Sequence, residues 1–240
     1  HPKYGLLSPG RFIPILESNG GVSRLDAYVW EETCRYLSSW RQQETLPKIN
    51  VSVNISRVDI YDHNLGPKLL ALVKKYQLTP DLLHLEITES VYVQNPQVLI
   101  TAVENLRQLG FFVEMDDFGS GYSSLNMLKE VPVDLLKLDI CFLSKGKEER
   151  GGNIISSILH MAHWLKLPVI AEGVETKVQA DYLKSLNCIY MQGYYFARPM
   201  PAEAFQALLQ KSLAGQVDTY EDVNLEGVVA FWDPSAQTAL

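Results

Sequence analysis

The chain has 240 residues, of which 47% are hydrophobic and 20% charged, and its formal net charge is −7. This composition excludes a disordered chain, and the length allows one large domain or two small ones. No apolar run reaches the roughly 18 residues that a membrane-spanning helix needs, and no signal peptide opens the sequence. The acidic balance argues against a nucleic-acid polymer as a partner, but it permits a small anionic ligand bound through metal ions.

Three cysteines, Cys34, Cys141 and Cys188, are scattered along the chain. Their odd number and wide spacing argue against a disulfide framework and favour a reducing environment. We therefore expect a cytoplasmic domain, which leaves open a membrane anchor elsewhere in a parent protein.

Strand and helix patterns alternate along the chain. In order, the sequence predicts a helix over 22–43, a strand over 49–54, a helix over 66–76, a strand over 82–88 and a helix over 96–109 that stops at Gly110. Further strands are predicted over 111–116, 133–138, 169–171 and 188–191, and further helices near 123–129, 153–166, 176–186 and 202–213. Six strands separated by helices indicate an α/β fold with a largely parallel sheet.

Two architectures fit this order, a doubly wound open sheet and a (β/α)8 TIM-like barrel. Polar residues end every predicted strand, which favours the barrel, because an open sheet concentrates its site at one switch point. A barrel needs eight strands, so we expect two more upstream of His1; a six-stranded open structure is the alternative. Residues 1–215 are assigned to this N-terminally incomplete barrel, and residues 216–240 to an acidic C-terminal linker or extension.

Seven carboxylates are predicted to share the rim at the carboxyl ends of the strands: Glu86, Glu89, Asp116, Asp117, Asp139, Glu172 and Glu175. So many like charges repel one another, and divalent cations would neutralise them. Oxygen ligands suit Mg²⁺, Mn²⁺ or Ca²⁺ better than zinc. Adjacent Asp116 and Asp117 can bridge two ions, the usual arrangement for hydrolysing phosphate esters, with Lys137 beside them to orient water or stabilise phosphorus.

Each of these features has an ordinary explanation when taken alone. An Asp-Asp pair after a strand is often a turn or a helix cap, and a single lysine is often part of a buried ion pair. Their joint placement on successive strand ends favours the metal site. The segment from Gly119 to Ser124 lacks the third glycine of the dinucleotide fingerprint, so it predicts a plain connecting loop or a mobile cover for the site. His84 is expected to face the barrel interior.

Seven segments carry a resemblance to a known family. They are SPGRFIPILESNG (8–20), VSVNIS (51–56), LEITES (85–90), DDFGSGYSSL (116–125), VPVDLLKLD (131–139), AEGVET (171–176) and QGYYFARPM (192–200). In this order they resemble the EAL domain, a phosphodiesterase that hydrolyses the bacterial messenger cyclic di-GMP to linear pGpG. The Glu-Ala-Leu tripeptide that names the family, whose glutamate is a metal ligand there, is absent from this sequence, and Ser120 replaces the usual threonine.

The resemblance implies a role for each matching position. One metal ion would be held by Asn54, Glu86 and Asp116, and a second by Asp116, Asp117, Glu172 and, through water, Gln192. Lys137 and Glu172 would act at the reacting centre, and Glu89 would anchor the loop 117–124. Substrate would contact Gly193, Tyr194, Arg198, Pro199, Asp139 and Glu175. The expected cofactors are two Mg²⁺ or Mn²⁺ ions, with Ca²⁺ inhibitory.

The resemblance also implies partners and leaves alternatives open. We expect cyclic di-GMP as ligand, a homodimer, and fusion to a GGDEF or sensor domain in a larger signalling protein. A catalytically silent cyclic di-GMP receptor is the alternative function, although such members typically lose several of the acidic and lysine positions kept here. A barrel glycosidase with two carboxylates is a third hypothesis; Lys137 beside two aspartates fits phosphoryl chemistry better.

Overall fold

The computed structural model describes residues 3–4, 7–43, 46, 48–119, 125–140 and 148–213. Cys141, the loop residues 120–124 and the predicted C-terminal segment 216–240 lie outside the described residues. No helix in the described ranges is both long and apolar enough to cross a membrane.

Six described strands form one parallel sheet. They are β1 (Val51–Asn54), β2 (Leu83–Thr88), β3 (Val113–Phe118), β4 (Leu135–Asp139), β5 (Val169–Glu172) and β6 (Tyr190–Gln192). Their order in the sheet is their order along the chain, without reversal. This order confirms the barrel type of fold, because a doubly wound sheet reverses its strand order at a switch point. The described strands form a half-barrel with β1 and β6 as its edges, and the two further upstream strands stay a prediction.

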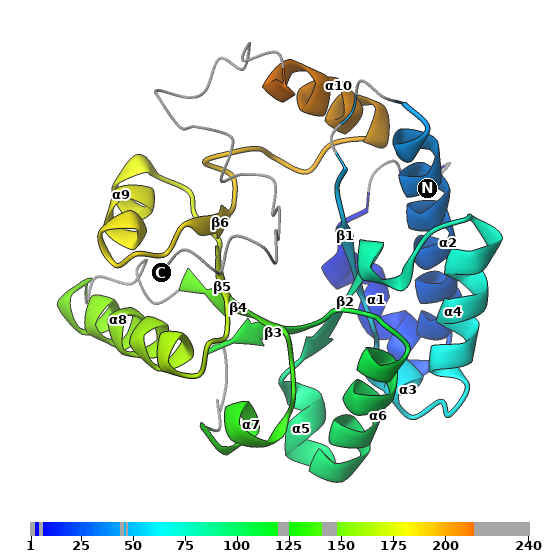
Figure 1. Cartoon of the computed structure of the whole chain (residues 1–240), viewed down its shortest axis with the longest axis horizontal. Helices are drawn as coiled ribbons and strands as arrows, with labels where there is room; N and C mark the ends of the chain where they lie inside the picture. The colour runs from blue at the N-terminus through cyan, green and yellow to red at the C-terminus, as the bar shows by residue number, and fades with distance from the viewer. Residues whose placement is uncertain are drawn as a thin grey trace.

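Helices surround the sheet (Figure 1). They are α1 (Pro9–Ser18), α2 (Val22–Arg41), α3 (Arg57–Ile60), α4 (Leu65–Lys75), the short 3₁₀ helix η1 (Pro80–Leu82), α5 (Ser90–Gln94), α6 (Pro96–Gln108), α7 (Leu125–Glu130), α8 (Glu148–Trp164), α9 (Lys177–Ser185) and α10 (Ala202–Leu213). The helices predicted from the sequence are all present, with small shifts of their ends. The sequence pattern did not predict α1, α3, α5 or the single turn η1. Two of these, α3 and α5, have only four and five residues, too few for a helical period to be recognised.

The strand expected over 111–116 begins two residues later, at Val113. The Phe111 N–H donates to Leu106 O at 3.1 Å and so still closes the end of α6. Gly110 lies between helix and strand with φ +92°, a left-handed conformation that a residue without Cβ adopts readily. The glycine therefore ends the helix as predicted, while the turn uses two residues that the pattern assigned to the strand.

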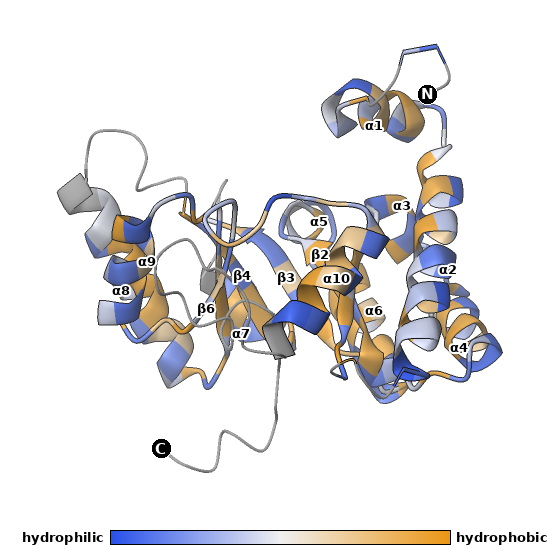
Figure 2. Cartoon of the chain, turned by 90° about the horizontal axis from the view of Figure 1, so that it is seen from above, coloured by the Kyte–Doolittle hydropathy of each residue, from blue (hydrophilic) through white to orange (hydrophobic). Residues whose placement is uncertain are grey.

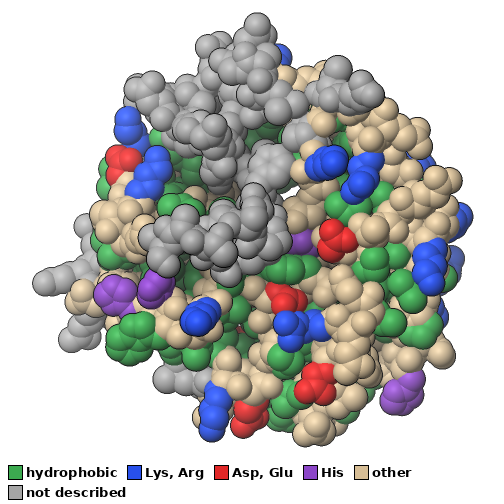
Figure 3. Space-filling model, viewed as in Figure 1, with side chains coloured by type: hydrophobic (Ala, Val, Ile, Leu, Met, Phe, Trp, Pro, Cys, Tyr) green, Lys and Arg blue, Asp and Glu red, His purple; other side chains and the backbone are tan. Residues whose placement is uncertain are grey.

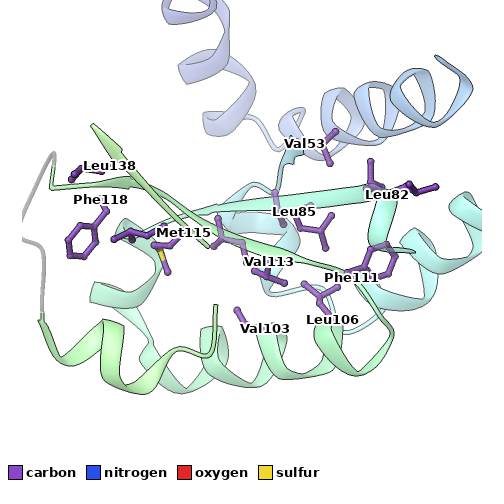
Figure 4. Packing of buried hydrophobic residues seen from close by; sticks show 14 of the residues in the cluster. Val53, Leu82, Leu85, Val103, Leu106, Phe111, Val113, Met115, Phe118 and Leu138 are labelled. Carbon is purple, nitrogen blue, oxygen red and sulfur yellow. The ribbon is translucent and has the colours of Figure 1, made fainter. Parts of the chain in front are cut away.

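The outer face of the sheet carries the hydrophobic core. Leu85 of β2 and Val113 of β3 are neighbours in register, and both are fully buried. Figure 4 shows Val103 and Leu106 of α6 facing this side of the sheet. In Figure 2 the helix faces turned toward the strands are mostly hydrophobic. Full burial of each such side chain contributes about 1.5–3 kcal/mol, so this face anchors the helices and leaves the opposite face of each strand for polar residues.

The last helix returns to the first long one. Trp40 at the end of α2 packs against Phe205 of α10 with ring centroids 5.7 Å apart, and its Nε1 donates to Gln206 Oε1 at 3.1 Å. Residues that are 166 positions apart in the chain are thus joined directly. The ring of helices therefore closes between α10 and α2, beside the edges of the described sheet.

Candidate active site

The carboxyl ends of the strands bring the predicted polar residues to one rim. The register pairs Asn54 with Glu86, and Glu172 lies between Asp139 and Gln192. Residues paired in register on neighbouring strands share a face of the sheet. Asn54, Glu86, Asp139, Glu172 and Gln192 are therefore on the face away from the hydrophobic core. The alternation of polar and apolar residues predicted this side of each strand correctly.

Lys137 of β4 lies at the centre of the rim. Its Nζ is 2.6 Å from Glu86 Oε1, 2.8 Å from Glu172 Oε1 and 3.4 Å from Asp116 Oδ1. The Lys137 side chain is only 5% exposed. Three carboxylates from three other strands thus surround one buried ammonium, and the cluster carries more negative than positive charge when all its groups are ionised.

The excess of carboxylates changes their acidity. Burial raises the pKa of Glu172 to about 7, because attraction to Lys137 offsets only part of the desolvation. Burial also raises the pKa of Glu86, against the same attraction. Burial alone would lower the pKa of Lys137, but Glu86, Glu172 and Asp116 outweigh that effect and raise it. Lys137 therefore stays charged, while the acids around it lack a full complement of positive charge.

The Asp116–Asp117 pair lies where the β3–β4 register is interrupted, between Met115 and Phe118. Asp117 has φ +56°, a left-handed conformation that aspartate tolerates better than most residues. Burial, followed by repulsion from Asp116, raises the pKa of Asp117. Such an irregularity re-aims side chains at the end of a strand. It places two consecutive carboxyl groups at the rim, where regular alternation would turn one of them away.

The residues at the rim fit a divalent cation. Asp116 Oδ1 is buried and accepts no hydrogen bond, although Lys137 Nζ lies 3.4 Å away. The surrounding donors are carboxylate and amide oxygens, the ligands that Mg²⁺ and Mn²⁺ prefer. In the described part of the chain, no three His, Cys, Asp or Glu side chains already converge as a ligand set. The ammonium of Lys137 occupies the point where the acids converge, so the fit rests on donor chemistry and charge.

The chain is similar to a known domain family and to curated members of it. Residues 1–199 match the EAL domain family. The chain belongs to the EAL domain family. Among curated relatives, the chain is 34% identical over 208 residues to the bifunctional diguanylate cyclase/cyclic di-GMP phosphodiesterase MucR of Pseudomonas aeruginosa, covering 86% of this chain and 30% of MucR. It is 37% identical over 211 residues to the cyclic di-GMP phosphodiesterase NbdA of the same organism, covering 88% of this chain and 27% of NbdA.

Solved structures agree with the sequence relatives. The MucR phosphodiesterase in complex with c-di-GMP superimposes with a TM-score of 0.79 at 34% identity, covering 85% of this chain and 83% of that one. The EAL enzyme Bd1971 gives 0.81 at 31% identity, covering 87% of this chain and 57% of that one. Because this chain spans less than a third of the length of MucR and NbdA, it corresponds to one domain of those longer proteins.

The predicted substrate residues of this EAL domain follow β6. Tyr194 is 52% exposed, and the Arg198 guanidinium carbon lies 4.7 Å from the centroid of its ring. Gly193 sits against the backbone of Val174, where a Cβ would approach the carbonyl oxygen to 2.2 Å. A cation stacked on an exposed aromatic ring is a surface on which a planar base and a phosphate can both bind. Pro199 follows directly in the same segment and is exposed.

The remaining predicted residues flank the acidic cluster. Glu89 is buried and immediately precedes α5, and its charge contributes to the raised pKa of Asp117. Glu175 is exposed just before α9, and its N–H donates to Gln179 Oε1 at 2.8 Å. Asp139 ends β4 as the register partner of Glu172. The structure thus brings Asp139 and Glu89 to the acidic rim and leaves Glu175 at its solvent edge.

A second polar group below the rim was only partly foreseen. His84 faces the barrel interior, as predicted, and its Nδ1 lies 2.6 Å from Glu114 Oε1. Glu114 was not singled out from the sequence. The signal was nevertheless present, because Glu114 precedes Asp116 by two residues and so shares its face of β3.

Acidic and basic side chains are interspersed on the face of the molecule shown in Figure 3. Among the described residues on that face there is no extended basic stripe of the kind that follows a nucleic-acid backbone. The expectation that a nucleic-acid polymer is not a partner stays a prediction.

Proposed function

We propose that this EAL domain hydrolyses cyclic di-GMP to the linear dinucleotide pGpG with two Mg²⁺ or Mn²⁺ ions. The cluster around Lys137 carries the proposal, because it combines surplus negative charge, oxygen donors and an Asp116 oxygen that accepts no hydrogen bond. The names of MucR and NbdA support the same substrate. A phosphodiester is an anion, so its approach to an acidic rim requires cations that outweigh the carboxylates.

The proposed ligands are those of the resemblance. Asn54, Glu86 and Asp116 would hold one ion. Asp116, Asp117 and Glu172 would hold the other, with Gln192 reaching it through water. Bound there, such ions neutralise charge on the phosphate and acidify a coordinated water. The raised pKa values of Glu86, Asp117 and Glu172 agree with this assignment, since burial and repulsion among the acids outweigh their attraction to Lys137.

Lys137 supplies the fixed positive charge of the proposed centre. Glu86 and Glu172 hold its ammonium from two sides, so the group is immobilised before substrate arrives. From that position it orients the attacking water and stabilises negative charge that grows on the phosphate. Arg198 and Pro199 line a guanine and phosphate subsite, with Gly193 and Tyr194 shaping its approach. Asp139 and Glu175 complete the substrate-facing rim, and Glu89 anchors the loop 117–124.

The test is hydrolysis by this domain together with the two expected upstream strands, with Mg²⁺ or Mn²⁺, followed by separation of cyclic di-GMP from pGpG. Asp116→Asn is expected to lower kcat/KM by at least about 10³-fold, roughly 4 kcal/mol of transition-state stabilisation, because the amide carries no charge for either ion. Glu104→Gln, an exposed change on α6, is the matched control. Binding of cyclic di-GMP by calorimetry without any hydrolysis would favour the silent receptor instead.

We further propose that the parent protein is cytoplasmic at this domain, forms homodimers and carries a GGDEF or sensor domain. MucR, whose name includes a diguanylate cyclase activity, supports the last point. Sedimentation of the full chain with and without Mg²⁺ tests the dimer, since a concentration-independent monomer under both conditions contradicts it.

A further inference from the structure

A connected polar network lies beneath the proposed metal ligands. Asn50 Nδ2 is 2.7 Å from His84 Nε2, His84 Nδ1 is 2.6 Å from Glu114 Oε1, and Ser52 Oγ donates to Glu114 Oε2 at 3.0 Å. The His84 and Glu114 side chains are 6% and 2% exposed. Both oxygens of a buried carboxylate are therefore satisfied by the two side chains to which it is joined.

The residues of this network lie on the same strands as the proposed ligands of the first metal ion, at positions two residues earlier. Ser52, His84 and Glu114 each precede a proposed ligand of the first metal by two residues on the same strand: Asn54 on β1, Glu86 on β2 and Asp116 on β3. A strand rises about 3.3 Å per residue, and alternate residues share a face. The three members thus form a layer one step below the three ligands, on the same side of the same three strands.

The hydrogen bonds of this layer run across the strands. Ser52 of β1 and His84 of β2 both bond Glu114 of β3, so side chains join three neighbouring strands in addition to the backbone ladders. Asn50 donates to Nε2, so Nδ1 carries the proton that His84 donates to Glu114. Phe112 stacks on the imidazole with ring centroids 4.3 Å apart. The ring is therefore fixed by two hydrogen bonds and one aromatic contact.

The hydrogen bonds from His84 and Ser52 matter to Glu114 because another carboxylate, Glu86, lies next to it. It is the register partner of Glu86, so two carboxylates stand side by side on adjacent strands. The Glu114 charge contributes to the raised pKa of Glu86, and Lys137 is 2.6 Å from Glu86. Without His84 and Ser52, Glu114 would be a buried carboxylate with unfilled acceptors beside Glu86.

We propose that Asn50, Ser52, His84 and Glu114 form a positioning layer that sets the spacing of the first metal site. The layer touches neither substrate nor metal; it acts through Asn54, Glu86 and Asp116. The inference rests on the proposed function, because it takes these three residues as metal ligands. Outer partners that orient ligands typically change metal affinity by 10–100-fold when they are removed.

The experiment measures Mn²⁺ binding to the full chain by calorimetry and electron paramagnetic resonance, without substrate. His84→Leu, which deletes the donor to Glu114, is expected to weaken Mn²⁺ binding by about tenfold or more. His84→Asn keeps an N–H near the position of Nδ1 and is expected to stay within about threefold of the wild type. His63→Leu, an exposed change, is the matched control.

Ser52 provides a smaller perturbation in case His84→Leu does not fold. Ser52→Ala removes one hydrogen bond to Glu114 and is expected to weaken Mn²⁺ binding several-fold. Ser52→Thr keeps the hydroxyl and is expected to bind Mn²⁺ as the wild type does. Folded Ser52→Ala and His84→Leu variants with wild-type Mn²⁺ affinity would overturn the inference. Hydrolysis of cyclic di-GMP by the wild type is measured in parallel. A wild type that binds Mn²⁺ without hydrolysis overturns the proposed function alone, and one that binds no Mn²⁺ overturns both.

Discussion

Lys137 Nζ lies 2.6 Å from Glu86 Oε1 and so joins β4 to β2 across the intervening strand β3. This contact can skip a strand because the sheet is curved, which brings side chains of non-adjacent strands close together on its concave inner face. The same ammonium also reaches Glu172 on β5. One side chain therefore holds together the interior of four consecutive strands, and its removal has consequences for stability as well as for activity.

Lys137→Met is expected to destabilise the metal-free domain by about 3–5 kcal/mol at pH 8, because it leaves buried carboxylates without a cationic partner. Urea unfolding in the presence of EDTA measures this change. Added Mn²⁺ should recover part of the loss by supplying positive charge to the same acids. The control is Lys68→Met, which breaks an exposed ion pair of equal length with Asp62 and should change stability little. Equal stability of Lys137→Met and wild type would contradict the central role of the ammonium.

A buried pair of carboxyl groups away from the rim predicts that the stability of the fold depends on pH. Asp26 of α2 is hydrogen-bonded to Asp59 of α3, and burial followed by this contact raises the pKa of Asp26 from 3.8 to about 7. Because the folded pKa is raised, the stabilisation is complete below about pH 3.8 and is lost as the pH rises through about 7. The free energy of unfolding should therefore fall between pH 5 and pH 8.

Asp26→Asn tests this dependence, since its amide donates to Asp59 at any pH. The stability of Asp26→Asn relative to wild type should increase from pH 5 to pH 8 and then level off. Thermal or urea unfolding at several pH values supplies the measurement, with the exposed Asp81→Asn as control. A relative stability that does not change with pH would show that Asp26 is ionised throughout this range.

Gly193 should tolerate no side chain. Its backbone lies against Val174, whose N–H donates to Gln192 O and whose O accepts from the Tyr195 N–H. A Cβ at this position would lie 2.2 Å from Val174 O, so Gly193→Ala must displace backbone. We expect a loss of about 1–3 kcal/mol in stability and weaker binding of cyclic di-GMP.

Gly10→Ala is the matched control for that change. Its Cβ would meet nothing closer than Ser8 Oγ at 4.0 Å, and Gly10 lies in the first turn of α1. The substitution should raise stability by up to about 1 kcal/mol, because alanine has less freedom in the unfolded chain. Calorimetric unfolding compares the two variants, and similar effects would disprove the close approach at Gly193.

Calcium should inhibit hydrolysis that Mg²⁺ or Mn²⁺ supports. Ca²⁺ accepts the same oxygen donors at longer distances and with more ligands, so it can fill the site while misplacing the attacking water. Initial rates at fixed Mg²⁺ with increasing Ca²⁺ should fall, and additional Mg²⁺ should restore them. Equal turnover with Ca²⁺ alone would show that the reaction does not depend on the tighter geometry of the smaller ions.

The sequence by itself determined the order of elements and the polarity of each strand. In LHLEIT, Leu83, Leu85 and Ile87 alternate with His84, Glu86 and Thr88, and burial of the first three against helices decides which face turns inward. The hydrophobic effect acts on each strand separately, so this part of the fold can be read locally. Gly110 ended its helix for an equally local reason.

The tertiary structure decided which polar residues meet. Lys137 and Glu86 are 51 positions apart in the chain, and β3 lies between their strands. Their contact therefore depends on the curvature of the sheet. The pairing of Glu114 with His84 and Ser52 depends on a register that fixes three strands at once. The contact of Trp40 with Gln206 requires the whole ring of helices. Alternation gives the face of a side chain, but its partner is set by register and curvature, which are properties of the assembled sheet.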